Sequence, residues 1–183
     1  MTVPEAQLEQ TEHGTIARGE GWFVLNARDA HWRDRGSRGL VCDFEAGQDW
    51  PQLGFNLFVL GPGQPMSMYH WETDQEDFLV LSGEALLIVE GEERPLKQWD
   101  FVHTPPGVPH TIVGAGDGPC VVVAVGARDR SVDSPDWGGY TVDDGALRHG
   151  AGVEEETADP YVAYARVPRR ERTPYRDGWL PDL

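Results

Sequence analysis

Side chains that could bind a metal ion gather in residues 63–76, which read Gly-Gln-Pro-Met-Ser-Met-Tyr-His-Trp-Glu-Thr-Asp-Gln-Glu. His70 and Glu72 are two residues apart, so on a β-strand their side chains point to the same face. A turn at residues 73–75 would then let Glu76 start a neighbouring strand beside them. An imidazole and two carboxylates that converge in this way can coordinate a divalent metal ion.

A second histidine follows a turn that is stiffened by prolines. Residues 105–110 read Pro-Pro-Gly-Val-Pro-His, which places His110 at the start of a strand. Two neutral imidazoles and two carboxylates suit a divalent transition metal. The predicted metal ligands are His70, Glu72, Glu76 and His110.

These two segments resemble the two motifs of the cupin superfamily and together cover about residues 63–114. The first motif contains Gly, a spacer, His-x-His, three or four residues, Glu, six residues and Gly, and the second reads Pro-x-Gly-x-x-His-x-x-x-Asn. The matching positions are His70, Glu76 and Gly83 in the first motif and Pro105, Gly107 and His110 in the second.

The resemblance carries expectations for fold, cofactor and partners. Cupins are small double-stranded β-helix barrels, often homodimeric, that hold a metal inside the barrel through three His and one Glu. The resemblance implies an all-β jelly-roll barrel, with His70, Glu76 and His110 as ligands. It also implies one divalent transition metal (Zn, Fe, Mn or Ni), a small-molecule ligand and a homodimer.

The sequence departs from the cupin pattern at two positions. Glu72 stands where the second His is expected, and Gly114 stands where Asn is expected. A carboxylate in place of an imidazole shifts the preference toward harder ions such as Mn²⁺ or Fe²⁺, with Zn²⁺ or Ni²⁺ still possible. Two roles for Glu72 stay open, namely a fourth ligand, or a general base and thus a catalytic residue beside a three-ligand metal.

The alternative to a metal site is a barrel that serves as an apolar binding cup. Glu72 and Glu76 would then be buried close together without a cation, and one of them would have to be protonated at considerable cost. That cost favours the metal site.

Short strands must position these residues. Strands are expected at residues 22–25, 40–44, 54–60, 66–71, 78–82, 85–90, 101–104, 110–113 and 120–125, and a tight turn at Gly91 returns residues 94–97 beside the preceding strand. This spacing, without long helical periodicity, predicts an antiparallel sandwich or barrel. The strand parity around His103 leaves open whether this residue faces the pocket.

Three regions are expected along the chain. Residues 1–20 are a loose N-terminus, residues 21–126 form the cupin barrel with N-terminal strands extending a sheet, and residues 127–183 form a mostly irregular C-terminal arm. The arm keeps six aromatic residues, so it should pack on the barrel or on a partner subunit. Asp159 and Pro160 predict a short helix over residues 161–166, and another short helix should end at Gly150.

The charge of the chain excludes some partners. With 31 acidic and 15 basic residues, the net charge is −16, which disfavours nucleic acid and anionic membranes. The acidic start of the chain lacks the features of a secretory signal and indicates a cytoplasmic protein. We expect a metal-dependent small-molecule enzyme of the oxygenase or isomerase type, or alternatively a non-catalytic protein that binds a small molecule or metal in the same barrel.

Overall fold

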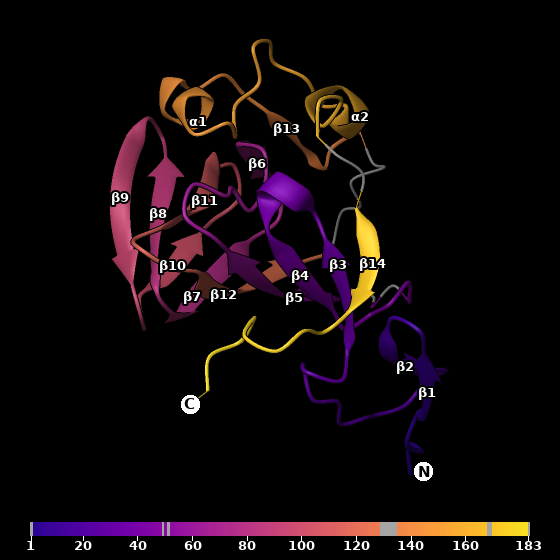
Figure 1. Ribbon diagram of the computed structural model, residues 1–183. Coiled ribbons are helices and arrows are strands. Elements are labelled where there is room, and N and C mark those ends of the chain that lie inside the picture. Colours follow the sequence, from indigo (N-terminus) through magenta and orange to yellow (C-terminus); the bar gives the residue numbers. More distant parts are fainter. Residues whose placement is uncertain (1, 49, 51, 129–134, 168–169, 183) are drawn as a thin grey trace.

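The computed structural model describes residues 2–48, 50, 52–128, 135–167 and 170–182. Two antiparallel sheets, neither closed on itself, face each other within this part of the chain (Figure 1). The seven-stranded sheet has the order β10 (Phe101–Thr104), β7 (Glu76–Ser82), β12 (Cys120–Ala127), β5 (Leu53–Leu60), β4 (Leu40–Asp43), β3 (His31–Asp34) and β14 (Glu171–Pro174). The five-stranded sheet has the order β13 (Gly138–Tyr140), β6 (His70–Glu72), β11 (His110–Ala115), β8 (Glu84–Val89) and β9 (Glu92–Lys97).

Apolar side chains from both sheets fill the space between them. Phe58 and Val122 come from the seven-stranded sheet, Leu87 and Ile112 come from the five-stranded sheet, and all four belong to one buried cluster. Burial of this apolar surface is the main driving force for packing the two sheets together. The predicted all-β jelly-roll architecture is confirmed.

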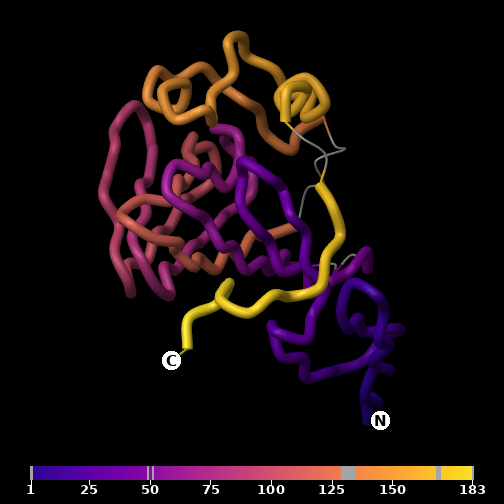
Figure 2. The backbone as a smooth tube through the Cα atoms, in the orientation of Figure 1, coloured from indigo at the N-terminus to yellow at the C-terminus, as the bar shows by residue number. Residues whose placement is uncertain are grey.

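The outer face of the seven-stranded sheet carries a second cluster. Trp32 and Leu57 are buried there, and Tyr175, Trp179 and Leu180 from the C-terminal end pack against them. Figure 2 shows this end of the chain as a yellow tube that runs down past the barrel. Some strands are therefore apolar on both faces because each face meets a separate cluster.

The turn between β8 and β9 is the predicted tight hairpin. Val89 pairs with Glu92, so only Glu90 and Gly91 connect the two strands. Both residues have positive φ, 47° at Glu90 and 80° at Gly91, as a two-residue turn of the mirror-image type requires.

Most predicted strands are present, but the strand expected at residues 66–71 is confined to β6 (His70–Glu72), and the strand expected at residues 22–25 is absent. Trp22 makes only an isolated bridge with Glu5, and Val24 is 78% exposed. This apolar run has no neighbouring strand to pair with, so it stays irregular. Conversely, the sequence did not predict the hairpin of β1 (Gln7–Thr11) and β2 (Gly14–Arg18), nor the short strands β3, β13 and β14, which lack a regular apolar alternation.

Residues 135–167 lie across one end of the barrel (Figure 1). They include β13 and the two short α-helices α1 (Asp144–Arg148) and α2 (Pro160–Ala163), while the 3₁₀ helix η1 (Gly36–Arg38) belongs to the barrel. The Asp159 side chain accepts a hydrogen bond from the Tyr161 N–H, so the predicted cap of α2 is present, but the helix ends at Ala163 and not at residue 166 as expected. No helix in the described ranges has the length and apolar character needed to span a membrane.

Candidate metal centre

Three strands bring the predicted ligands together. His110 at the start of β11 pairs directly with His70 at the start of β6. Residues 73–75 then turn the chain, and Glu76 opens β7 in the opposite sheet. On β7, Glu76 has the same parity as the buried Phe78, so its side chain points into the barrel.

The nitrogen and oxygen atoms of these side chains converge. His70 Nε2 lies 3.3 Å from Glu72 Oε1 and 3.6 Å from Glu76 Oε2. His110 Nε2 lies 3.2 Å from Glu76 Oε2, and the two imidazole rings are 5.3 Å apart between centroids. The donor atoms of His70, Glu72 and Glu76 all lie within 4.8 Å of one another, and His110 adjoins this group through Glu76.

The backbone fixes the orientation of both imidazoles. His70 Nδ1 is 2.8 Å from the Met68 carbonyl oxygen, and His110 Nδ1 is 2.9 Å from the Val108 carbonyl oxygen. A carbonyl only accepts hydrogen bonds, so each Nδ1 must carry the proton. The lone pair of each neutral ring is therefore on Nε2, which faces the carboxylates, as in metal-binding histidines.

Two buried atoms of the site lack hydrogen bonds. Neither Glu76 Oε2 nor His110 Nε2 has a hydrogen-bond partner in the described chain, although both are shielded from solvent. Two lone pairs that face each other inside a protein are unfavourable unless a cation or a proton lies between them. A divalent metal fits this donor set, because imidazole nitrogen and carboxylate oxygen both coordinate such ions.

The site combines burial with charge. Burial would lower the pKa of His70, but the Glu72 side chain and the charge of Glu76 outweigh burial and raise it. Burial would raise the pKa of Glu76, but His110 and His70 lower it. Both shifts favour the charged forms, so the metal-free site favours a protonated His70 and keeps Glu76 ionised.

Exposure increases from one side of the site to the other. The His110 side chain is 2% exposed and the Glu72 side chain is 29% exposed, with His70 and Glu76 in between. Glu72 is therefore the side chain nearest to solvent, where a small molecule would approach.

Aromatic residues that sequence reasoning did not place here enclose His70. The rings of Trp137 and Tyr140 lie 6.3 and 5.9 Å from the His70 ring, and Tyr140 pairs with His70 in the sheet. Burial, together with Tyr164 and Glu72, raises the pKa of Tyr140, so this phenol stays protonated. The high aromatic content of the C-terminal segment was the only sequence signal for this enclosure.

His103 lies outside the site. It pairs in register with Asp77, the outward-facing neighbour of Glu76, and its Nδ1 lies 2.6 Å from Asp77 Oδ1. Its side chain is 51% exposed. The parity that the sequence left open therefore directs His103 away from the barrel interior.

The structure explains the departure from the cupin pattern at Gly114. A Cβ at this position would lie 2.2 Å from the Gly61 carbonyl oxygen. The strand β11 passes so close to the chain after β5 that Asn, or any residue with a side chain, would clash here.

Comparison with known proteins agrees with this architecture. Residues 56–126 match the family model described as Cupin domain, and this range runs from within β5 to near the end of β12. Together with the two sequence motifs, this match supports membership of the cupin superfamily. A search of curated proteins finds no match.

Several solved structures are similar to this chain. A putative sugar phosphate isomerase from Acidithiobacillus ferrooxidans shares 26% identity over 49% of this chain and 60% of its own, with a TM-score of 0.45. A sugar phosphate isomerase from a cupin superfamily, from Silicibacter pomeroyi, shares 27% identity over 56% of this chain and 62% of its own, with a TM-score of 0.44. A cupin 2 domain-containing protein from Halorhodospira halophila shares 24% identity over 47% of this chain and 59% of its own, with a TM-score of 0.42. The chain thus covers less than two thirds of each of these structures.

Proposed function

We propose that the barrel binds one divalent transition metal ion and uses it in a reaction on a small molecule. The observation that carries this proposal is the pair of buried atoms, His110 Nε2 and Glu76 Oε2, which lie 3.2 Å apart without hydrogen-bond partners among the described residues. His70, Glu76 and His110 would hold the metal, and Glu72 would be the fourth ligand. Zn, Fe, Mn and Ni all accept such a mixed set, and two carboxylates favour Mn or Fe.

The chain's own groups suit such a reaction. When bound, the metal would act as a Lewis acid on substrate oxygen atoms. The Met68 and Val108 carbonyls keep both imidazoles in the tautomer that presents Nε2. In the alternative in which Glu72 does not coordinate the metal, its carboxylate, the most exposed of the four, is placed to accept a proton from a molecule at the open side of the site. An oxygenase or isomerase type of reaction would use this Lewis acidity, with His70, Glu72, Glu76 and His110 holding the ion.

Metal analysis of the purified protein tests this proposal. We expect about one metal ion per chain, and a loss of most of it in His110→Ala. His103→Ala is the matched control, because it also removes an imidazole but lies outside the site, and it should keep the metal. Equal metal content in His110→Ala and His103→Ala, or no uptake by wild type from Mn²⁺, Fe²⁺, Ni²⁺ or Zn²⁺, would contradict the proposal.

A non-catalytic binding protein is the second candidate. Trp137 and Tyr140 enclose His70, and His110 lies beside the cluster of His70, Glu72 and Glu76, so that four side chains could serve a single ion. If these groups saturate the metal, no position is left for a substrate. Water-proton relaxation of the Mn²⁺-loaded protein separates the two candidates, since an exchangeable water on the metal supports the enzyme and its absence supports the binding protein.

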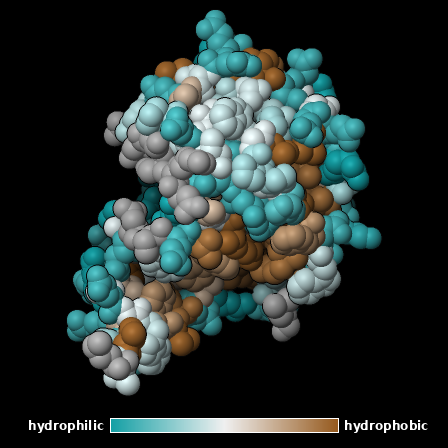
Figure 3. All heavy atoms as spheres, turned by 180° about the vertical axis from the view of Figure 1, so that it is seen from behind, coloured by the Kyte–Doolittle hydropathy of each residue, from teal (hydrophilic) through white to brown (hydrophobic). Residues whose placement is uncertain are grey.

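We also propose a homodimer. Figure 3 shows hydrophobic side chains gathered over the lower part of the molecule as seen from behind. Large apolar side chains exposed on the seven-stranded sheet include Leu53, Phe55 and Phe101. Exposed apolar area of this kind is typical of an interface. Sedimentation equilibrium at tens of micromolar should give twice the chain mass of 20.3 kDa, and a monomer would contradict the proposal.

A further inference from the structure

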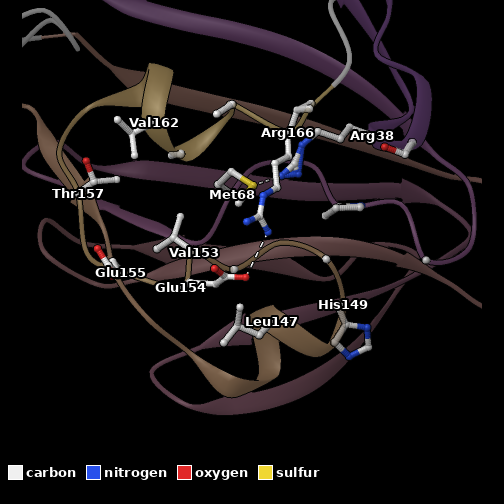
Figure 4. A pocket seen from close by; sticks show the side chains of 18 residues that line it. Arg38, Met68, Leu147, His149, Val153, Glu154, Glu155, Thr157, Val162 and Arg166 are labelled. Atoms are coloured by element: carbon white, nitrogen blue, oxygen red, sulfur yellow. Dashed lines mark hydrogen bonds and ion pairs between the residues drawn. The ribbon is translucent and has the colours of Figure 1, made fainter.

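A pocket of about 750 Å³ lies outside the barrel, between the η1 region and the C-terminal segment that contains α1 and α2 (Figure 4). Arg38, Pro65 and Met68 line it from the barrel, and residues 147–167 supply the opposite walls. None of the four candidate metal ligands lines this pocket. It is therefore a cavity separate from the metal centre.

Arg38 brings a buried positive charge to this pocket. The residue is 3% exposed, its Nη2 lies 2.7 Å from Met68 Sδ, and its Cζ lies 5.2 Å from the centre of the Tyr164 ring. A thioether is only a weak acceptor, and the Arg38 Nε has no hydrogen-bond partner in the described ranges. No carboxylate there forms an ion pair with Arg38 either.

More positive charge lies beside Arg38. Arg35 is 8% exposed, and its Nη2 donates to the carbonyls of Arg38 and Met66. Burial lowers the pKa of Arg35 to about 10, and the charges of Arg170 and Arg38 contribute to the decrease. Burial and Arg170 likewise lower the pKa of Arg38. A buried guanidinium without an anion is costly, so this cluster has an unmet requirement for negative charge.

The rest of the pocket combines apolar with polar and charged side chains. Val153 and Val162 line the walls, and Figure 4 shows Arg166 extending across the pocket to Glu154. These two side chains are paired at 3.2 Å and are mostly exposed, at 87% and 73%. Arg166 thus neutralises Glu154, the carboxylate of Glu155 also lines the pocket, and Arg38 is a positive charge, unpaired among the described residues, that is buried at its wall.

We propose that this pocket binds a small organic oxyanion, a carboxylate or a phosphate monoester, whose charged group pairs with Arg38 and whose apolar part packs between Val153 and Val162. A guanidinium suits this role because its planar N–H groups match the oxygens of a carboxylate or phosphate. The proposal is independent of the metal, because no metal ligand lines the pocket.

NMR with ¹³C-methyl-labelled methionine tests the proposal in the intact chain. The protein has three methionines, and Met68 contacts Arg38 directly, so its methyl signal reports on the pocket. We expect hexanoate or hexyl phosphate to shift the Met68 signal, and the neutral hexanol to leave it unchanged. Whichever anion binds more tightly identifies the class of ligand. No shift with either anion up to about 10 mM would overturn the proposal.

Two variants complete the test. Arg38→Met should weaken anion binding at least about tenfold, measured by calorimetry, while Arg94→Met, which removes an exposed arginine on β9, should leave it unchanged. Unchanged anion binding in Arg38→Met would overturn the proposal. If this variant does not fold, the titration of the Met68 signal in the wild-type protein remains the test. The metal-free His110→Ala variant should bind the anion as wild type does, so failure of the metal site and failure of this site are distinguishable.

Discussion

His110 and Glu76 approach each other inside the barrel as two acceptors, Nε2 and Oε2, at 3.2 Å. The Nδ1 proton of His110 is engaged by the Val108 carbonyl, so the Nε2 lone pair faces the carboxylate oxygen. Only a proton or a metal ion can make this arrangement favourable. Glu72 and His70 place two more atoms with lone pairs next to this contact. Four such potential metal ligands in one place favour a metal ion over a proton.

Substitution of Glu72 tests its role as a ligand. Glu72→Gln keeps the volume but removes the charge, so we expect metal affinity to fall at least about tenfold, measured by competition with a chromogenic chelator. Glu72→His should retain metal with a preference for softer ions. Glu92→Gln, on the exposed strand β9, is the control and should change nothing.

A different result would assign Glu72 as a base. If Glu72→Gln binds metal as tightly as wild type but loses turnover of a substrate, the carboxylate moves a proton and does not coordinate. If neither Glu72 variant changes occupancy, selectivity or turnover, the side chain has no part in the site.

The pH dependence of stability should differ between the metal-free and the loaded protein. The pKa of His70 is raised above its ordinary 6.5. The contribution of His70 to the free energy of unfolding is therefore fully present below pH 6.5 and is lost as the pH rises through the folded-state pKa. The pKa of Glu76 is lowered from 4.5. Its contribution to the free energy of unfolding is therefore fully present above pH 4.5 and is lost as the pH falls through its folded-state pKa. The two groups together therefore stabilise the metal-free protein most between about pH 4.5 and 6.5.

Metal binding requires neutral imidazoles, so the increase in Tm on adding Zn²⁺ or Ni²⁺ should grow from about pH 5.5 to 8. Differential scanning fluorimetry measures it. An increase that is largest at pH 5.5 would mean that the metal binds elsewhere.

Much of this site followed from the sequence, because its signals are local. The His70 and Glu72 parity, the turn before Glu76 and the proline turn before His110 each involve a few adjacent residues. The enclosure by Tyr140 could not be predicted in this way, since β13 is three residues long and its pairing with β6 joins positions 70 residues apart along the chain. The orientation of the His103 side chain could not be predicted either, because it depends on the register in which His103 pairs with Asp77 on the neighbouring strand.

Gly114 is a second case in which the sequence alone does not give the contact that matters. The sequence reveals a missing Asn, but only the fold reveals the Gly61 carbonyl that excludes a side chain. Gly114→Ala should destabilise the protein by about 2 kcal/mol in chemical unfolding, because its Cβ would overlap that carbonyl. Gly118→Ala is the matched control, since nothing lies within 4 Å of a Cβ there, and it should be near neutral. Equal effects of the two substitutions would contradict the close approach of β11 to this segment.

The C-terminal end should contribute to stability through Trp179. Its ring meets the Trp32 ring edge-on at 5.4 Å, and Trp32 is fully buried. Trp179→Ala should lower the free energy of unfolding by about 1–2 kcal/mol, less than a fully buried Trp, because Trp179 is half-buried. Tyr161→Ala, at an 87% exposed aromatic residue, should cost less than about 0.5 kcal/mol. If both variants unfold alike, the C-terminal end does not cover Trp32 in solution.

Anomalous diffraction from crystals of the metal-loaded protein, recorded at the absorption edge of the bound metal, tests the metal site directly. We expect one strong peak per chain, about 2.0–2.3 Å from His70 Nε2, His110 Nε2 and a Glu76 carboxylate oxygen. A peak bound by other residues, or no peak inside the barrel of a fully loaded protein, would contradict the proposed metal centre.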